Sequence, residues 1–113
     1  MTLDLPAPID QALLNERVQA WADALRRSSS APSEAFAVEV DRLRKYWRIV
    51  TVSYGQRSAH AFLDPATGDV YKPAGWKAPA KGVRYNLLRQ ASYDALLTRA
   101  EASGGWAGGY LYR

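Results

Sequence analysis

The chain lacks cysteine altogether and has a single histidine among its 113 residues. The absence of cysteine excludes a disulfide scaffold, a thiolate metal site and a cysteine nucleophile. One histidine leaves no partner for a multi-histidine zinc site. Apolar runs fall well short of the roughly 20 residues that cross a bilayer, and residues 1–10 do not resemble a secretory signal. These absences predict a soluble, intracellular protein that uses no cofactor or metal and contacts no membrane.

Apolar residues make up 48% of the chain and aromatic residues 12%, a composition that excludes a disordered protein. A chain of this length buries roughly two-thirds of its unfolded surface when it folds. We therefore expect one domain, residues 1–113, that folds without covalent cross-links.

Charge is divided unevenly along the chain. Residues 1–41 have seven acidic and three basic side chains, a net charge of −4. Residues 42–113 have four acidic and twelve basic side chains, a net charge of +8. The densest basic stretch is residues 70–89, which contain five basic side chains and no acid. This asymmetry indicates a surface that meets an anion.

The spacing of apolar residues predicts a helix over residues 9–28, and Asp10 is positioned to cap its start. A second helix is predicted over residues 92–102, with Ser92 or Asn86 as its cap. The first helix has an apolar stripe at steps of three and four, formed by Leu14, Val18, Trp21 and Leu25. We expect this stripe to lie in the core.

Short segments of alternating or β-branched residues predict an antiparallel meander. The four predicted strands are residues 35–41, 46–54, 58–63 and 70–72. Turns are predicted at residues 55–57 and at residues 64–69, where Gly68 can take a positive φ. Residues 35–41 also fit a helical stripe, so a helix stays an alternative to the first strand.

The glycine-rich tail, residues 104–113, is too apolar to be left in water. Gly104 is predicted to end the second helix as a left-handed C-cap, and the tail to return to the sheet as an edge strand. The predicted fold class is α+β: an N-terminal helix packed on an antiparallel β-meander, a basic loop over residues 73–86, a short C-terminal helix and a final strand.

The basic loop is the best candidate for a ligand site. Its prolines restrict the backbone, so less entropy is lost on binding, and Gly75 and Gly82 let backbone amides approach an anion. Arg84 can hold two phosphate oxygens at once, and aromatic rings offer flat faces to a base. The candidate ligand-binding residues are His60, Tyr71, Lys72, Trp76, Lys77, Lys81, Gly82, Arg84 and Tyr85. This combination predicts a site for a nucleotide or single-stranded nucleic acid.

These features also have a structural explanation. Trp76 can anchor the loop in the core while the lysines are merely solvated. His60, on a predicted strand face with Ser58 and Phe62, is of a type that usually serves as a hydrogen-bonded structural residue. The loop has neither the P-loop spacing nor a dinucleotide-binding glycine motif, and no serine has a nucleophile-elbow motif. We therefore expect no enzyme.

Residues 58–87 read SAHAFLDPATGDVYKPAGWKAPAKGVRYNL. This string resembles small uncharacterised proteins of tailed bacteriophages. The likeness lies in a strand–turn–strand followed by Trp76-Lys77, by Pro-Ala-Lys-Gly at residues 79–82 and by Arg84. The resemblance implies a phage origin and a host-cytoplasm setting, and it implies no mechanism.

Three functions fit these observations. The first is a non-enzymatic phage protein that binds a nucleotide or single-stranded nucleic acid through the basic loop, and in a phage setting counters host defence by sequestering a nucleotide signal. The second is a protein inhibitor whose basic surface blocks a host nuclease, polymerase or defence complex. The third is a virion or assembly component that uses the aromatic tail for contacts. The sequence leaves the oligomeric state open.

Overall fold

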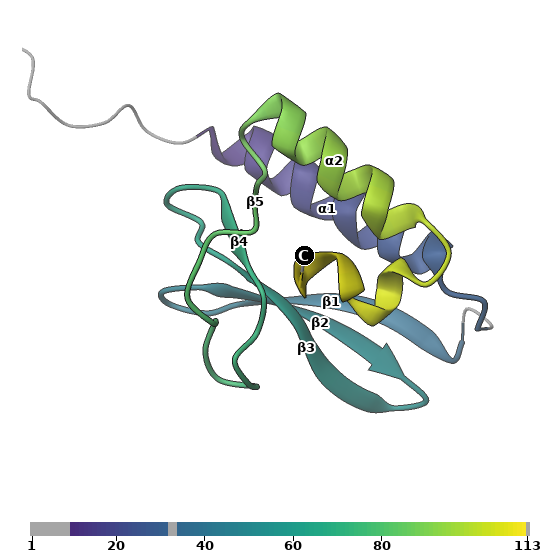
Figure 1. Cartoon of the computed structure of the whole chain (residues 1–113). Coiled ribbons are helices and arrows are strands. Elements are labelled where there is room, and N and C mark those ends of the chain that lie inside the picture. Colours follow the sequence, from purple (N-terminus) through teal and green to yellow (C-terminus); the bar gives the residue numbers. More distant parts are fainter. Residues whose placement is uncertain (1–9, 32–33, 113) are drawn as a thin grey trace, which may run out of the picture.

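The computed structural model describes residues 10–31 and 34–112, and it confirms the α+β class (Figure 1). Two helices lie over one face of a five-stranded antiparallel sheet whose strands follow chain order. The elements are α1 (Gln11–Ser28), β1 (Phe36–Arg42), β2 (Trp47–Ser53), β3 (Gln56–Leu63), β4 (Asp69–Tyr71), β5 (Tyr85–Asn86), α2 (Gln90–Glu101) and the 3-10 helices η1 (Gly105–Ala107) and η2 (Gly109–Tyr112). Strand β1 confirms the strand prediction over its helical alternative. Residue 9, the predicted start of the first helix, lies outside the described residues.

Helix α1 forms because one side of it is apolar. All four residues of the predicted stripe are at most 3% exposed, so the stripe lies in the core as expected. Asp10 Oδ1 accepts a hydrogen bond of 3.0 Å from the Leu13 N–H, which confirms the predicted cap. The helix packs against both α2 and β1.

The two faces of the sheet have different surroundings. The inner face, turned toward α1, contributes to the hydrophobic core with Val38, Ile49, Ala61 and Leu63. On the opposite face, which we call the outer face, the ladder register places four side chains in one row across β1, β2, β3 and β4: Asp41, Arg48, Phe62 and Tyr71. A charged pair therefore lies beside two aromatic rings on the outer face.

A β-bulge in β3 decides where His60 points. The register shifts between Ile49 and Val50, which leaves His60 without a partner across the ladder. His60 turns into the core, whereas Phe62 packs against Tyr46 on the outer face. The prediction that His60 and Phe62 share a face is therefore wrong, because simple alternation fails at a bulge.

The first predicted turn is shorter than expected. Tyr54 and Gly55 alone connect β2 to β3, so residues 56–57, expected in the turn, belong to β3. The second turn lies where it is predicted, and Gly68 has a φ of +82°, although Asp69, expected in the turn, is the first residue of β4. A Cβ at Gly68 would also come within 2.9 Å of the Leu88 side chain, so glycine is required there on two grounds.

Helix α2 begins at Gln90, slightly before the predicted start, and neither predicted cap serves it. Its N-cap is Arg89, which makes no side-chain capping bond. Instead, Asn86 Oδ1 accepts from the N–H groups of Leu88 and Arg89, and Ser92 Oγ accepts from the Asn86 N–H. These bonds fix the turn that precedes the helix. Neither helix in the described part of the chain is long and apolar enough to cross a membrane.

The tail does not form the predicted final strand. Gly104 and Gly108 both have a φ of +84°, and they turn the chain into η1 and η2. The turns bury Tyr110 and Leu111 in the core. A strand would direct alternate side chains to opposite faces, so it could not bury these two neighbours together.

Candidate functional site

Residues 72–84, which we call the basic hairpin, fold back on themselves and extend from β4 and β5 on the side away from the helices (Figure 1). A hydrogen bond of 2.9 Å from the Ala80 N–H to Lys72 O and a bridge between Pro73 and Pro79 hold the two legs together. Because proline fixes φ and the legs are bonded to each other, the hairpin tip is stiff.

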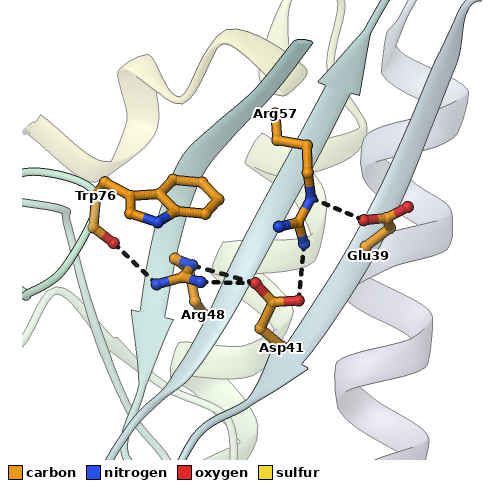
Figure 2. Close-up of polar contacts among 5 residues, drawn as sticks. All are labelled: Glu39, Asp41, Arg48, Arg57 and Trp76. Atoms are coloured by element: carbon orange, nitrogen blue, oxygen red, sulfur yellow. Dashed lines mark hydrogen bonds and ion pairs between the residues drawn. The ribbon is translucent and has the colours of Figure 1, made fainter. Parts of the chain in front are cut away.

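The tip places Trp76 on the outer face of the sheet, over Arg48 of β2 (Figure 2). Arg48 Cζ lies 3.8 Å from the centre of the indole ring, and Arg48 Nη1 donates to Trp76 O at 3.1 Å. Trp76 nevertheless stays 38% exposed. Arg57 Cζ lies 5.3 Å from the centre of the same ring. Trp76 is therefore held by the two arginines without being sealed in the core.

Asp41 of β1 holds Arg48 in place. Its Oδ2 accepts from Arg48 Nη2 and its Oδ1 accepts from Arg57 Nη2, both at 2.8 Å. Burial opposes ionisation of Asp41, but hydrogen bonds from the two arginines outweigh it and hold the pKa of this carboxyl below its usual value. Arg57 also donates from Nε to Glu39 at 3.1 Å, as Figure 2 shows. Two guanidinium groups and two carboxylates balance each other, so this arginine–carboxylate row supports Trp76 without adding net charge.

Beside Trp76 lies a hollow of about 400 Å³, which we call the Trp76 groove. It is lined by residues 57–59 of β3, residues 73–76 of the basic hairpin and Tyr112. Tyr112 is 57% exposed, and Lys72 Nζ lies 4.8 Å from the centre of its ring. None of the described residues that line the groove is acidic. The groove thus combines two aromatic walls with the positive charge of Lys72 at its edge.

A second cavity of about 400 Å³ lies at the base of the basic hairpin, and we call it the Arg84 cavity. Its lining comprises Asp69, residues 83–86, Arg89 and Ser92. The Asp69 carboxylate accepts a hydrogen bond of 2.8 Å from Asn86 Nδ2, so it is already engaged within the wall. The two arginines give this cavity positive charge as well.

The structure brings only some of the predicted site residues together. Trp76 lines its groove and Lys72 lies beside it through the contact with Tyr112. Arg84 and Tyr85 line the Arg84 cavity. The predicted residues that are exposed on the hairpin but line neither cavity are Lys77, Lys81 and Gly82.

Other predicted residues are engaged by contacts within the protein. Tyr85 is only 8% exposed, and its hydroxyl donates to the backbone oxygen of Tyr110. Tyr71 is half-buried, and its ring makes a T-shaped contact with the ring of Tyr46. The Gly75 N–H, expected to face an anion, donates within the hairpin tip instead.

His60 belongs to a buried hydrogen-bond network. Tyr110 Oη accepts from Trp21 Nε1 at 2.8 Å and lies 2.6 Å from His60 Nε2. Burial lowers the pKa of His60 to about 4, against the opposing effect of a hydrogen bond to the Trp106 backbone. The neutral ring therefore accepts the Tyr110 hydroxyl proton at Nε2 and carries its own proton toward Trp106. In residues 10–31 and 34–112, no three His, Asp or Glu side chains gather closely enough to hold a metal ion.

The arginine–carboxylate row is not among the features predicted from the sequence. The sequence predicts a turn at Arg57. The pairing of Asp41 with Arg48 depends on strand register, which cannot be predicted from the sequence alone. One signal is available: Arg48 is the one charged residue in residues 46–54, a strand otherwise made of uncharged, mostly β-branched and aromatic residues. A charge in such a strand requires a partner on a neighbouring strand.

By fold and site, this is a small α+β domain with a stiff basic hairpin and an aromatic groove beside β3. The chain belongs to the family described as Family of unknown function (DUF7717), which matches residues 9–113. No curated protein and no solved structure matches the chain.

Proposed function

We propose that the protein is a non-enzymatic binding protein for a phosphate-bearing ligand that carries a base, either a nucleotide or single-stranded nucleic acid. The observation that supports this most directly is the Trp76 groove. Two exposed rings, Trp76 and Tyr112, border one hollow of about 400 Å³ that has Arg57 in its wall and no acid among its described lining residues.

The two rings would hold the base. Stacking of a base on an aromatic side chain is worth about 1–3 kcal/mol and tolerates any base, because every base has a π-face. Trp76 is held in advance by Arg48, through the stack on its ring and the bond to its backbone. Little conformational entropy is then lost when a ligand arrives.

Cations around the groove would hold the phosphate. Arg57 directs Nε and Nη2 to carboxylates, which leaves Nη1 of its guanidinium for a ligand oxygen. Throughout the described part of the chain, no carboxylate forms an ion pair with Lys72, Lys77 or Lys81. The lysines of the hairpin therefore keep their charge available to an anion.

A binding role suits this groove better than catalysis. His60, the single histidine, is buried and neutral, and it lies in the core. The carboxylates of the adjoining row, Asp41 and Glu39, are engaged by arginines. The described residues that line the groove include no histidine and no carboxylate, which are the side chains that serve most often as general acids and bases.

A phage origin, a host-cytoplasm location and the sequestration of a nucleotide signal are finer parts of the proposal, and they rest on the sequence resemblance. The identity of the natural ligand would test the sequestration of a nucleotide signal. Mass spectrometry of small molecules and nucleic acid released from the purified protein would supply it.

Tyr112→Ala tests the aromatic half of the proposal. Titration of the protein with ADP and with a fluorescein-labelled oligothymidylate dodecamer at low salt should show binding by the natural sequence. Loss of one stacking ring should weaken that binding about tenfold or more. The proposal would be refuted if the natural sequence bound neither probe. It would also be refuted if the natural sequence and Tyr112→Ala bound the probes with equal affinity.

A matched pair of lysine variants tests the cationic half. Lys72 and Lys45 each lie over a tyrosine ring, at 4.8 and 5.4 Å, but Lys45 lies over Tyr46, outside the groove. Lys72→Gln should weaken binding several-fold more than Lys45→Gln, although both remove one charge. Equal effects of the two variants would show that only the net charge of the protein matters.

A further inference from the structure

We infer that the natural ligand is single-stranded nucleic acid several nucleotides long, which runs along the basic hairpin from the Trp76 groove to the Arg84 cavity. This inference rests on the proposed function and narrows it. It starts from the placement of two cavities of similar size, about 400 Å³ each and each with arginine in its wall, at the tip and at the base of one hairpin.

The return leg of the hairpin, residues 79–84, leads from the tip to the Arg84 cavity and bends at Lys81 and Gly82, where Gly82 has a φ of +99°. The leg is bonded to β4 and the residue after it, by Ala80 N–H to Lys72 O at 2.9 Å and by Arg84 N–H to Val70 O at 2.7 Å. The five steps from Pro79 to Arg84 span at most roughly 18 Å in an extended chain. Successive phosphates of a stacked nucleic-acid strand advance about 3.4 Å, so roughly five stacked nucleotides at most cover the leg.

Positive charge continues along this path. Lys77 is exposed at the tip and Lys81 on the return leg, and the Arg84 cavity adds Arg84 and Arg89. Lys77, Lys81 and Arg89 form no ion pair with any carboxylate of the described residues. A backbone that carries one charge per nucleotide is the anion that such a row of separated cations matches.

The shape of the Trp76 groove argues against a single small nucleotide as the whole ligand. Sites for small molecules bury most of the ligand surface. Here Trp76 stays 38% and Tyr112 57% exposed, so a lone nucleotide would lie open on the surface. A nucleic-acid strand gains binding free energy from several weak contacts along the hairpin, whereas a mononucleotide gains it from one contact only.

The test compares ligands of increasing length: thymidine monophosphate and oligothymidylates from a trimer to a dodecamer. Affinity should rise at least tenfold from the monomer to the hexamer and then level off. The logarithm of the dodecamer affinity should fall with the logarithm of salt concentration with a slope steeper than about −2, since each of three or more phosphate contacts contributes about −0.7. A monomer that binds as tightly as the dodecamer would overturn this inference while leaving the proposed function intact, whereas failure of every length would overturn both.

Variants at the base of the hairpin test the path itself. Arg84→Gln with Arg89→Gln should lower the dodecamer-to-monomer affinity ratio at least five-fold. The matched control, Arg44→Gln with Lys45→Gln, removes two exposed cations from the β1–β2 turn, away from both cavities. Because Arg84 is half-buried, Arg89→Gln alone provides a variant at an exposed position, and it should lower the same ratio by a smaller factor. The proposed path would be refuted if Arg44→Gln with Lys45→Gln lowered the dodecamer-to-monomer affinity ratio as much as the Arg84 and Arg89 variants did.

Discussion

At the β2–β3 turn, Tyr54 holds a backbone conformation that few residues other than glycine adopt. Tyr54 and Gly55 have φ values of +50° and +83°, and two positive φ values in a two-residue hairpin loop are typical of a type I′ turn. Asparagine takes the left-handed conformation more easily than tyrosine, for which it costs about 1–2 kcal/mol. The tyrosine ring is 75% exposed, so little packing offsets this cost.

Tyr54→Asn is therefore expected to stabilise the protein. The free energy of unfolding should rise by about 1 kcal/mol and Tm by about 4 °C, measured by calorimetry. Tyr54→Phe keeps the aromatic ring and the strain, and its Tm should match that of the natural sequence. A lower Tm for Tyr54→Asn would mean that the ring supports the fold after all.

At the scale of elements, the pairing of β1 with β2 determines the position of the basic hairpin. Asp41 and Arg48 face each other across this ladder, and Arg48 in turn holds Trp76. The Arg48 side chain is only 11% exposed, so loss of its charged partner leaves a cation poorly compensated.

Asp41→Asn should lower the free energy of unfolding by about 2 kcal/mol, since hydrogen bonds to charged groups contribute about 1.5–3 kcal/mol. Urea unfolding measures the change. The matched control is Asp23→Asn, which breaks the exposed Arg26–Asp23 pair and should cost less than about 1 kcal/mol. Equal losses in the two variants would show that Asp41 acts as an ordinary surface residue.

Periodicity predicted most of the elements but not their contacts across the chain. The apolar stripe was sufficient to predict α1, because local spacing alone determines it. The segment of β1 fits both a strand and a helix in the sequence, and its pairing with β2 decides for the strand. The prediction of a final strand in the tail is wrong because the conformation of the tail depends on Tyr110. The hydroxyl of Tyr110 forms hydrogen bonds with residues of α1 and β3. The sequence predicts one wall of the Trp76 groove, because Trp76 lies in the basic segment itself. Arg57 and Tyr112 are distant from Trp76 in the sequence, and only the fold brings them to the groove.

Across the whole molecule, the acidic and basic parts of the chain meet. Glu39 and Asp41, from the acidic first part, pair with Arg48 and Arg57 of the basic second part. These pairs neutralise cations on the sheet but do not reach the hairpin lysines. The predicted asymmetry of charge is thus concentrated on the basic hairpin, residues 72–84, which is the surface that the proposed ligand would contact.

The core network around His60 makes the stability of the whole molecule depend on pH. The folded pKa of His60 is about 4, against 6.5 for an ordinary histidine. Between these values the unfolded chain binds a proton that the folded chain excludes, so the free energy of unfolding falls as pH falls. We expect a loss of about 2 kcal/mol between pH 7 and pH 5. Asp41 does not contribute in this window, because its pKa is lowered from a usual value that already lies below pH 5.

Urea unfolding at the two pH values measures this loss, and the single histidine makes a second measurement direct. Its imidazole resonances in the folded protein belong to His60 alone, and they should stay those of a neutral ring down to about pH 5. His60→Gln removes the titrating group, so its unfolding free energy should vary less over the same window. An imidazole that titrates near 6.5 in the folded protein would contradict the buried network, because a protonated ring could not accept the Tyr110 hydroxyl proton.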